Sequence, residues 1–244
     1  MRLQSRYMAL LRTAIGFVAM FGAGSAYSQL SIQSVANSDY VSQGISQTLG
    51  EPTLQAGLSY GHTSGLYAGF WVAENSLYTH YQTNYRVKDN TIREIDYYAG
   101  WQTPTEKGGT WSATWSRYTF PDDPRYTDYR YDELVLSYET GNGITASLGV
   151  NDKFYKIDKH SVFAEASYEF AINRTLLLNA GYGYHDTEKI FDRDYRYWNV
   201  GITKLMGRVS FNLNYIDTDN NAVTIFSEDA AGDRWAFSVG LSIF

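Results

Sequence analysis

Residues 235–243 read Trp-Ala-Phe-Ser-Val-Gly-Leu-Ser-Ile, so large apolar side chains alternate strictly with Ala, Ser and Gly. Successive side chains of a β-strand point to opposite faces of the sheet, so this period of two predicts a strand with one apolar and one polar face. Residues 208–215 repeat the pattern: the apolar set is Val209, Phe211, Leu213 and Tyr215, and the polar set is Arg208, Ser210, Asn212 and Asn214. These two segments predict neighbouring strands of a sheet that separates an apolar phase from water.

The same alternation recurs along the chain, and no helical period competes with it. It is clear at residues 94–101, 111–116, 133–139, 144–151 and 162–169, and weaker at 31–42, 53–61, 66–75, 176–185 and 195–203. With the two segments above, the total is twelve predicted strands. Residues 66–75 carry aromatic side chains on both faces, so the pattern leaves open which face of that strand contacts water.

The connections between these segments alternate in length. Short ones are 62–65, 103–109, 140–143, 171–174 and 204–207, and long polar ones are 43–52, 76–90, 120–130, 152–159, 186–194 and 218–233. An even strand number with short turns on one rim and long loops on the other is typical of a bacterial outer-membrane barrel. The predicted fold is therefore all-β, a transmembrane antiparallel up-and-down barrel of about twelve strands. The alternatives are a secreted β-sandwich and a lipocalin-like soluble barrel, which would turn the apolar face inward.

Composition supports an exported β protein. The 244 residues are 44% hydrophobic and 16% aromatic, with 22 Tyr, 6 Trp, no Cys and a mean hydropathy of -0.36. Such a chain is too apolar for disorder, and it lacks the long apolar runs of a helical membrane bundle. Since no disulfide can hold an exported chain without cysteine, closure of the sheet is a suitable means of stabilisation.

The first residues have the three parts of a secretory signal peptide. Three arginines precede the uncharged stretch 13–24, and the small residues Ala26 and Ser28 close it. We expect residues 1–28 to be cleaved and residues 29–244 to form the barrel. The remaining chain has 17 basic and 26 acidic side chains, which argues against nucleic acid as a partner.

Aromatic residues lie near both ends of the predicted apolar face. Trp101, Trp111, Tyr138 and Tyr168 fall near the short-turn rim, and Tyr182, Tyr184, Trp198, Tyr215 and Trp235 fall near the long-loop rim. Two such girdles mark the interfaces of a membrane barrel.

Four stretches of the chain are distinctive. They are residues 38–47 (SDYVSQGISQ) followed by Pro52, residues 65–71 (GLYAGFW), residues 94–100 (EIDYYAG) and residues 215–219 (YIDTD). Together they resemble the TorF family of proteobacterial porins. Many members have Arg-Gly where this chain has Gln43-Gly44. The resemblance implies an outer-membrane barrel with a transport role, and it implies no catalytic residues.

The polar face carries the candidate pore-lining charges, which are Asp39, Glu94, Asp96, Glu133, Glu139, Glu165, Glu169, Arg208 and Arg234. Acidic side chains around a lumen favour cations, so we expect a preference for cations. The alternative is that some carboxylates pair with the arginines and select nothing.

Other chemistry has weaker support. His62-Thr63-Ser64 looks like a lipase pair, and His160-Ser161 and His185-Asp186 lack an obvious third member, so ordinary rim histidines are the favoured interpretation. Asp217, Asp219, Asn221 and Glu228 fit a calcium-loop spacing, but Ala222 replaces the turn glycine, which favours a solvated acidic loop. We therefore expect no catalytic residue, no metal and no cofactor.

The long loops are rich in tyrosine. These side chains would bind sugars or cell surfaces, or they would narrow the mouth of the barrel: Tyr78, Tyr81, Tyr126, Tyr129 and Tyr131.

The sequence thus predicts an outer-membrane porin for passive diffusion of small hydrophilic solutes. Its alternatives are a plugged barrel with a structural or surface-binding role and an outer-membrane hydrolase. The expected partners are outer-membrane lipid, lipopolysaccharide, and the barrel assembly machinery acting through the terminal aromatic Phe244.

Overall fold

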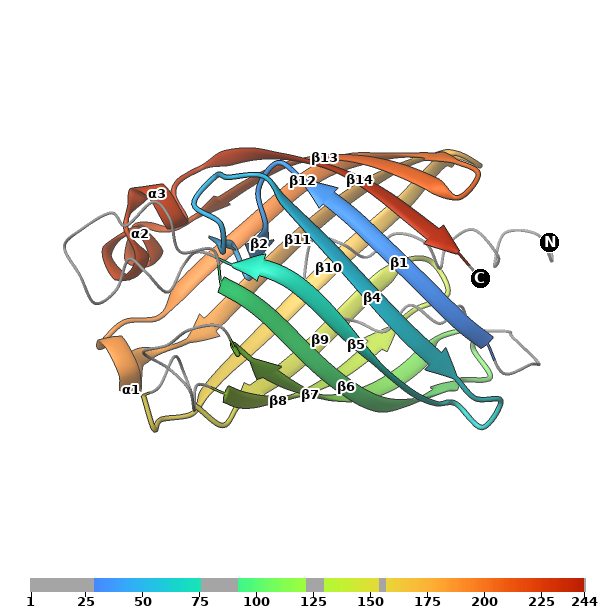
Figure 1. Cartoon of the computed structure of the whole chain (residues 1–244), viewed down its shortest axis with the longest axis horizontal. Helices are drawn as coiled ribbons and strands as arrows, with labels where there is room; N and C mark the ends of the chain where they lie inside the picture. The colour runs from blue at the N-terminus through green and yellow to red at the C-terminus, as the bar shows by residue number, and fades with distance from the viewer. Residues whose placement is uncertain (1–28, 76–91, 122–129, 154–156, 244) are drawn as a thin grey trace.

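The protein is a closed antiparallel barrel of twelve strands (Figure 1). The computed structural model describes residues 29–75, 92–121, 130–153 and 157–243. The barrel strands are β1 (Gln29–Asn37), β4 (Thr53–Gly61), β5 (Leu66–Asn75), β6 (Ile92–Pro104), β7 (Thr110–Thr119), β8 (Arg130–Glu139), β9 (Ile144–Asn151), β10 (Ser161–Asn173), β11 (Leu176–Asp186), β12 (Tyr195–Met206), β13 (Val209–Thr218) and β14 (Arg234–Ile243).

Each barrel strand pairs with its neighbours in the sequence, and β1 closes the ring against β14. Both the strand number and the up-and-down order confirm the sequence prediction. The predicted signal peptide and Phe244 lie outside the described residues, as do Tyr78, Tyr81, Tyr126 and Tyr129.

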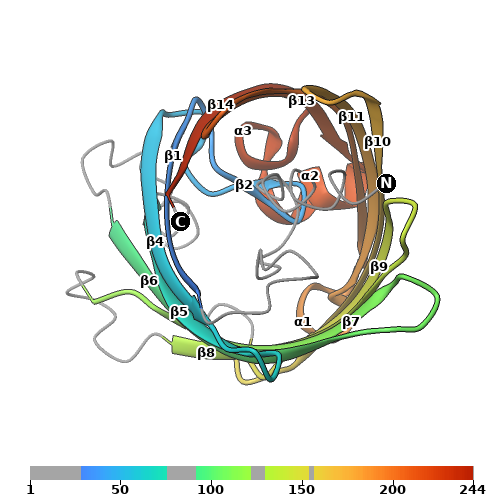
Figure 2. The same ribbon diagram turned by 90° about the vertical axis from the view of Figure 1, so that its right-hand side faces the viewer.

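The prediction was wrong for residues 31–42, which do not form one strand. β1 ends at Asn37, and the chain then forms a separate hairpin of β2 (Val41–Ser42) and β3 (Ile45–Ser46). Figure 2 shows β2 inside the outline of the barrel. Gln43 and Gly44 form the turn with φ values of 50° and 80°, which is the two-residue geometry that joins tightly paired strands.

The long loops also contain short helices, although no helical period is visible in the sequence. These are α1 (Glu188–Phe191), α2 (Asn220–Phe226) and α3 (Glu228–Ala231). The Asp219 carboxylate accepts hydrogen bonds from the backbone N–H groups of Asn221 and Ala222, so it caps α2. No described helix is long and apolar enough to cross a bilayer.

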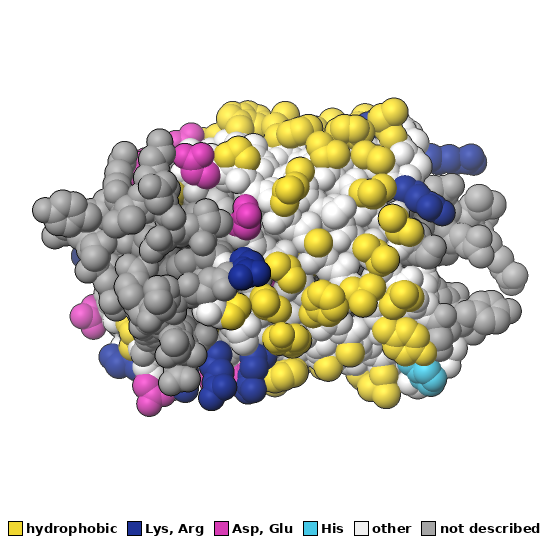
Figure 3. All heavy atoms as spheres, viewed as in Figure 1, with side chains coloured by type: hydrophobic (Ala, Val, Ile, Leu, Met, Phe, Trp, Pro, Cys, Tyr) yellow, Lys and Arg dark blue, Asp and Glu magenta, His cyan; other side chains and the backbone are white. Residues whose placement is uncertain are grey.

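The apolar face of the sheet is its outer face, as the sequence predicts. The side chains of Leu134, Leu136 and Leu148 are exposed on the outside, whereas Glu133 and Ser137, which flank Leu134 and Leu136 along β8, are buried in the lumen. Figure 3 shows apolar side chains spread over the middle of the barrel, with charged groups gathered toward its ends. For β5, whose orientation the sequence left open, Tyr67 and Trp71 face the lumen and Phe70 faces outward.

The two aromatic groups lie on this outer face. Trp111 and Tyr138 have ring centroids 4.6 Å apart toward the short-turn rim. Toward the long-loop rim, the Tyr215 ring lies 5.5 Å from Trp198 and 5.2 Å from Trp235. Both rims of the apolar belt therefore carry rings with the spacing of packed aromatic pairs.

Candidate functional site: the barrel lumen

The lumen has an acidic wall. Every charged side chain that faces inward from the described parts of β6 to β10 is a carboxylate: Glu94 and Asp96 from β6, Glu133 and Glu139 from β8, and Glu165 and Glu169 from β10. Strand alternation places them there, because every second residue of each strand faces the lumen. The opposite wall, in its described residues, contributes the inward-facing Arg234 of β14.

The carboxylates differ in depth and in hydrogen bonding. Glu94, Asp96 and Glu133 are buried toward the long-loop end, whereas Glu139 and Glu169 are partly exposed toward the short turns. The Tyr118 hydroxyl donates to Glu133 over 3.1 Å, and the Tyr197 hydroxyl donates to Glu165 over 2.5 Å. Tyr197 lies on β12 and reaches Glu165 across Gly183 of β11, which leaves room for its ring.

The wall formed by β11 to β14 carries a neutral network of amides and hydroxyls. The Asn199 amide donates to Asn179, and the Asn212 amide donates to Ser238. Thr203 donates to Asn212. The lumen is therefore polar on all sides and negatively charged on one.

The hairpin β2–β3 is fixed inside the long-loop end by a buried ion pair. Nη1 of Arg234 lies 3.0 Å from the Asp39 carboxylate, and the two side chains are only 12% and 6% exposed. The same carboxylate accepts hydrogen bonds from the hydroxyls of Ser46 and Thr48. Asp39 and Arg234 thus anchor the hairpin, which agrees with the alternative that some of the carboxylates pair with the arginines. The hairpin itself was not predicted from the sequence.

An apolar cluster completes the attachment of the hairpin. Ile45 packs with Tyr195 and Tyr197 of β12 and with residues of α2 and α3, namely Ala222, Phe226, Ala230 and Ala231. Gly44 is required at the turn, because a Cβ there would lie 2.4 Å from the Cβ of Tyr197. Hairpin and helices therefore form one packed unit at the β12–β14 side of this mouth (Figure 2).

The remaining predicted charge, Arg208, lies away from this region. It is exposed beside the short turn between β12 and β13, and its backbone carbonyl accepts a hydrogen bond from Ser242. Hence the structure brings together Asp39 and Arg234 at one mouth, and Glu94, Asp96 and Glu133 on the acidic wall. Arg208, Glu139 and Glu169 lie apart from both groups.

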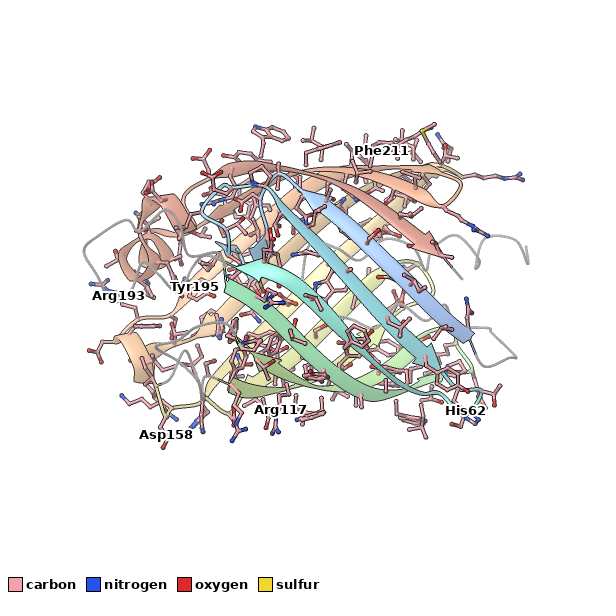
Figure 4. All side chains as sticks on the ribbon, viewed as in Figure 1. His62, Arg117, Asp158, Arg193, Tyr195 and Phe211 are labelled. Atoms are coloured by element: carbon pink, nitrogen blue, oxygen red, sulfur yellow. The ribbon has the colours of Figure 1, made fainter. Side chains whose placement is uncertain are left out.

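The histidines occupy different settings. His62 is exposed at the end opposite the helices, where its Nδ1 lies 2.9 Å from the Ser64 hydroxyl (Figure 4). His160 is exposed near Lys189. His185 is buried, with Nε2 3.0 Å from Ser161 and Nδ1 2.9 Å from Tyr195, so it bridges three strands. This contact could not be seen in the sequence, because the residues that His185 contacts are not its neighbours along the chain.

The calcium-loop residues serve the α2 region instead of converging. Asp219 caps α2 and forms an ion pair with Arg196, and the Asn221 amide donates to the backbone of Asp194. Asp217 accepts from the backbone of Thr218, and Glu228 begins α3. The described residues contain no group of three or more Asp, Glu, His or Cys side chains that could hold a metal ion.

The closed twelve-stranded sheet, with its apolar outside and polar lumen, defines the class: this is a barrel with the architecture of outer-membrane channels. The KdgM porin in complex with disordered oligogalacturonate aligns with a TM-score of 0.55 and 7% identity, covering 89% of this chain and 99% of that one. The COG4313 outer membrane channel from Pseudomonas putida F1 aligns with a TM-score of 0.54 and 11% identity, and the alignment covers 90% of this chain and 96% of that one.

The particular family follows from the sequence match. The model of a family of bacterial proteins of unknown function (Gcw_chp) matches residues 22–242, so the chain belongs to that family. No curated protein matches it. The likeness to the solved channels, at such low identity, establishes the fold.

Proposed function

We propose that this protein is an outer-membrane porin that passes small hydrophilic solutes by diffusion and prefers cations. The observation that carries the proposal is the acidic wall of β6 to β10 in a polar lumen. Carboxylates in a confined lumen raise the local concentration of cations and repel anions. The resemblance to TorF family porins supports the same proposal, which assigns no catalysis to the chain.

The proposal places residues 29–244 in the outer membrane after removal of residues 1–28. The exposed apolar belt would contact lipid, and the charged groups at the long-loop rim would meet lipopolysaccharide. The barrel assembly machinery would recognise Phe244. An anionic chain such as the oligogalacturonate in the KdgM complex is a poor solute for this lumen, because the acidic wall would repel it.

Neutralising the acidic wall tests the cation preference. A double variant, Glu94→Gln with Asp96→Asn, should move the reversal potential in a salt gradient toward zero. Acidic side chains around a lumen favour cations, so losing these two carboxyl groups should lower the cation-to-anion permeability ratio. The measurement is the single-channel reversal potential in a planar bilayer.

The matched control is Asp132→Asn, which removes an outward-facing carboxylate beside Arg117 and leaves the lumen unchanged. Equal reversal potentials in the wild type and the double variant would rule out the acidic wall as the selective element. A folded protein that gives no current would instead favour the plugged structural barrel, an alternative that rests on the hairpin inside the mouth.

A further inference from the structure

Three cations form a basic patch at the short-turn rim, on the side of β10 to β13. Arg174 lies in the turn between β10 and β11, Lys204 lies on the outer face of β12, and Arg208 lies in the turn between β12 and β13. All three side chains are exposed. Lys204 pairs with Leu176 in the sheet, and its Nζ donates to the Thr175 hydroxyl over 2.9 Å. The Lys204 ammonium therefore lies beside the turn that carries Arg174.

No acidic side chain of the described outer face balances this patch. Residues 170–185 and 195–216 contain no Asp or Glu, and Glu169, which precedes the first range, faces the lumen. Cations toward the long-loop rim differ, because Arg117 and Arg196 each form an ion pair with an aspartate. The basic patch is thus an uncompensated positive region on a chain that is acidic as a whole.

A row of large apolar side chains borders the basic patch on the outer face. In the register of the sheet it crosses five neighbouring strands, and each side chain is 37–50% exposed: Phe170, Leu178, Ile202, Leu213 and Phe237. Ile202 precedes Lys204 by two residues, which is roughly 7 Å along a strand. Phe211, which pairs with Lys204, also points away from the barrel (Figure 4). Figure 3 shows Lys or Arg side chains next to apolar ones at the short-turn end.

Positive charge beside exposed apolar surface matches an anionic amphiphile. Guanidinium groups bind phosphate oxygens through paired N–H donors, and a Lys ammonium binds phosphate as a point charge. Basic side chains at a membrane surface attract anionic lipid headgroups, while an apolar surface covers hydrocarbon chains. A soluble phosphate compound would use the charges and leave the apolar row without a contact. The combination therefore favours a phospholipid over a soluble anion.

We propose that the basic patch binds the phosphate of an anionic phospholipid of the periplasmic leaflet, whose acyl chains lie along the apolar row. The guanidinium groups of Arg174 and Arg208 would donate to the phosphate oxygens. Lys204 would add a further contact, because its ammonium has three donors and uses one on Thr175. The proposal rests on the proposed function for the outer-membrane location, with the short turns in the periplasm. It goes beyond solute passage, since the site lies outside the lumen.

Native mass spectrometry with added lipid tests the site without requiring conduction. The protein, expressed from the full-length sequence and purified in detergent, is mixed with equal amounts of dioleoyl phosphatidylglycerol and dioleoyl phosphatidylcholine, which have the same acyl chains. We expect the phosphatidylglycerol adduct to dominate in the wild type. In the triple variant Arg174→Gln, Lys204→Gln and Arg208→Gln this preference should fall at least about tenfold, because each basic side chain adds to the attraction for an anionic headgroup.

The matched control is a single exchange on the opposite wall. Lys204→Gln should lower the phosphatidylglycerol preference severalfold, whereas Lys107→Gln, in the short turn between β6 and β7 beside Glu106, should leave it unchanged. Glycerol 1-phosphate, which has the phosphate without acyl chains, should not displace the lipid. Far-UV circular dichroism verifies that each variant has folded.

Several results would overturn the proposal. Equal adducts of the two lipids in the wild type would do so, and so would an unchanged preference in the triple variant or an equal loss in Lys107→Gln and Lys204→Gln. Displacement of the lipid by glycerol 1-phosphate would identify a soluble phosphate as the ligand and would overturn the phospholipid. Cation-selective current without a lipid preference would overturn this site alone, and a lipid preference in a silent barrel would overturn the proposed diffusion function alone.

Discussion

Replacing Arg234 by Ala should both destabilise the barrel and raise its single-channel conductance. The guanidinium forms a buried ion pair with Asp39 and donates to the backbone carbonyls of Gly232 and Asp229. Removing one partner of a buried pair leaves an uncompensated charge and costs about 3–5 kcal/mol. The hairpin would lose its anchor to β14 and α3, so we expect larger and noisier current steps.

Two further variants separate the pair from its surroundings. The double variant Asp39→Ala with Arg234→Ala should recover part of the lost stability, because no charge is then left buried without its partner. Arg117→Ala removes an exposed pair with Asp132, whose side chains are 42% and 29% exposed, and should leave both the stability and the conductance nearly unchanged. Urea unfolding in lipid vesicles and bilayer recordings measure the two effects. Unchanged conductance in Arg234→Ala would show that the hairpin does not limit the current.

Placing Arg at the middle of the outer face should have an effect of similar size. Leu148 lies on β9 opposite Leu136 of β8, and both side chains are exposed in the apolar belt. If this belt contacts lipid, Leu148→Arg should destabilise the barrel by about 2–4 kcal/mol, which is the cost of Arg near the bilayer midplane. Urea titration of the protein folded into vesicles measures this difference.

The same substitution near the rim is the control. Met206 is 61% exposed at the short turn after β12, so Met206→Arg should cost about 0–1 kcal/mol. Equal costs at positions 148 and 206 would contradict a bilayer around the belt. The test works in detergent-free vesicles only, because micelles adapt their shape to a charged side chain.

The sequence predicted those parts of the fold that follow from local alternation. Trp235, Phe237 and Leu241 lie outside and Ser238 lies inside, as the period of two requires. At β5 the pattern was ambiguous, because Tyr67 and Trp71 have as much apolar surface as Phe70. Only the packing of Trp71 with Val35 and Ala73 decides which face is internal.

The anchored hairpin could not be predicted in the same way. Asp39 forms its ion pair with Arg234, which lies 195 positions further along the sequence, and no local pattern predicts such a contact. The same holds for His185 and Ser161, which lie 24 residues apart on neighbouring strands. For the pore-lining charges, alternation placed the side chains in the lumen, but their depth and their hydrogen-bond partners depend on the neighbouring strands.

The seam between β1 and β14 has a consequence for how the barrel is made. The backbone N–H of Phe237 donates to the Ser38 hydroxyl at this seam, although the two residues are 199 positions apart. Every other barrel ladder joins consecutive barrel strands, so this one alone must wait for the whole sheet. Until it forms, the nascent sheet presents two unpaired edges that can pair with other chains. Pairing of β1 with β14 therefore converts an aggregation-prone intermediate into a barrel without free strand edges. A chain that ends before β14 would keep the two unpaired edges of the intermediate.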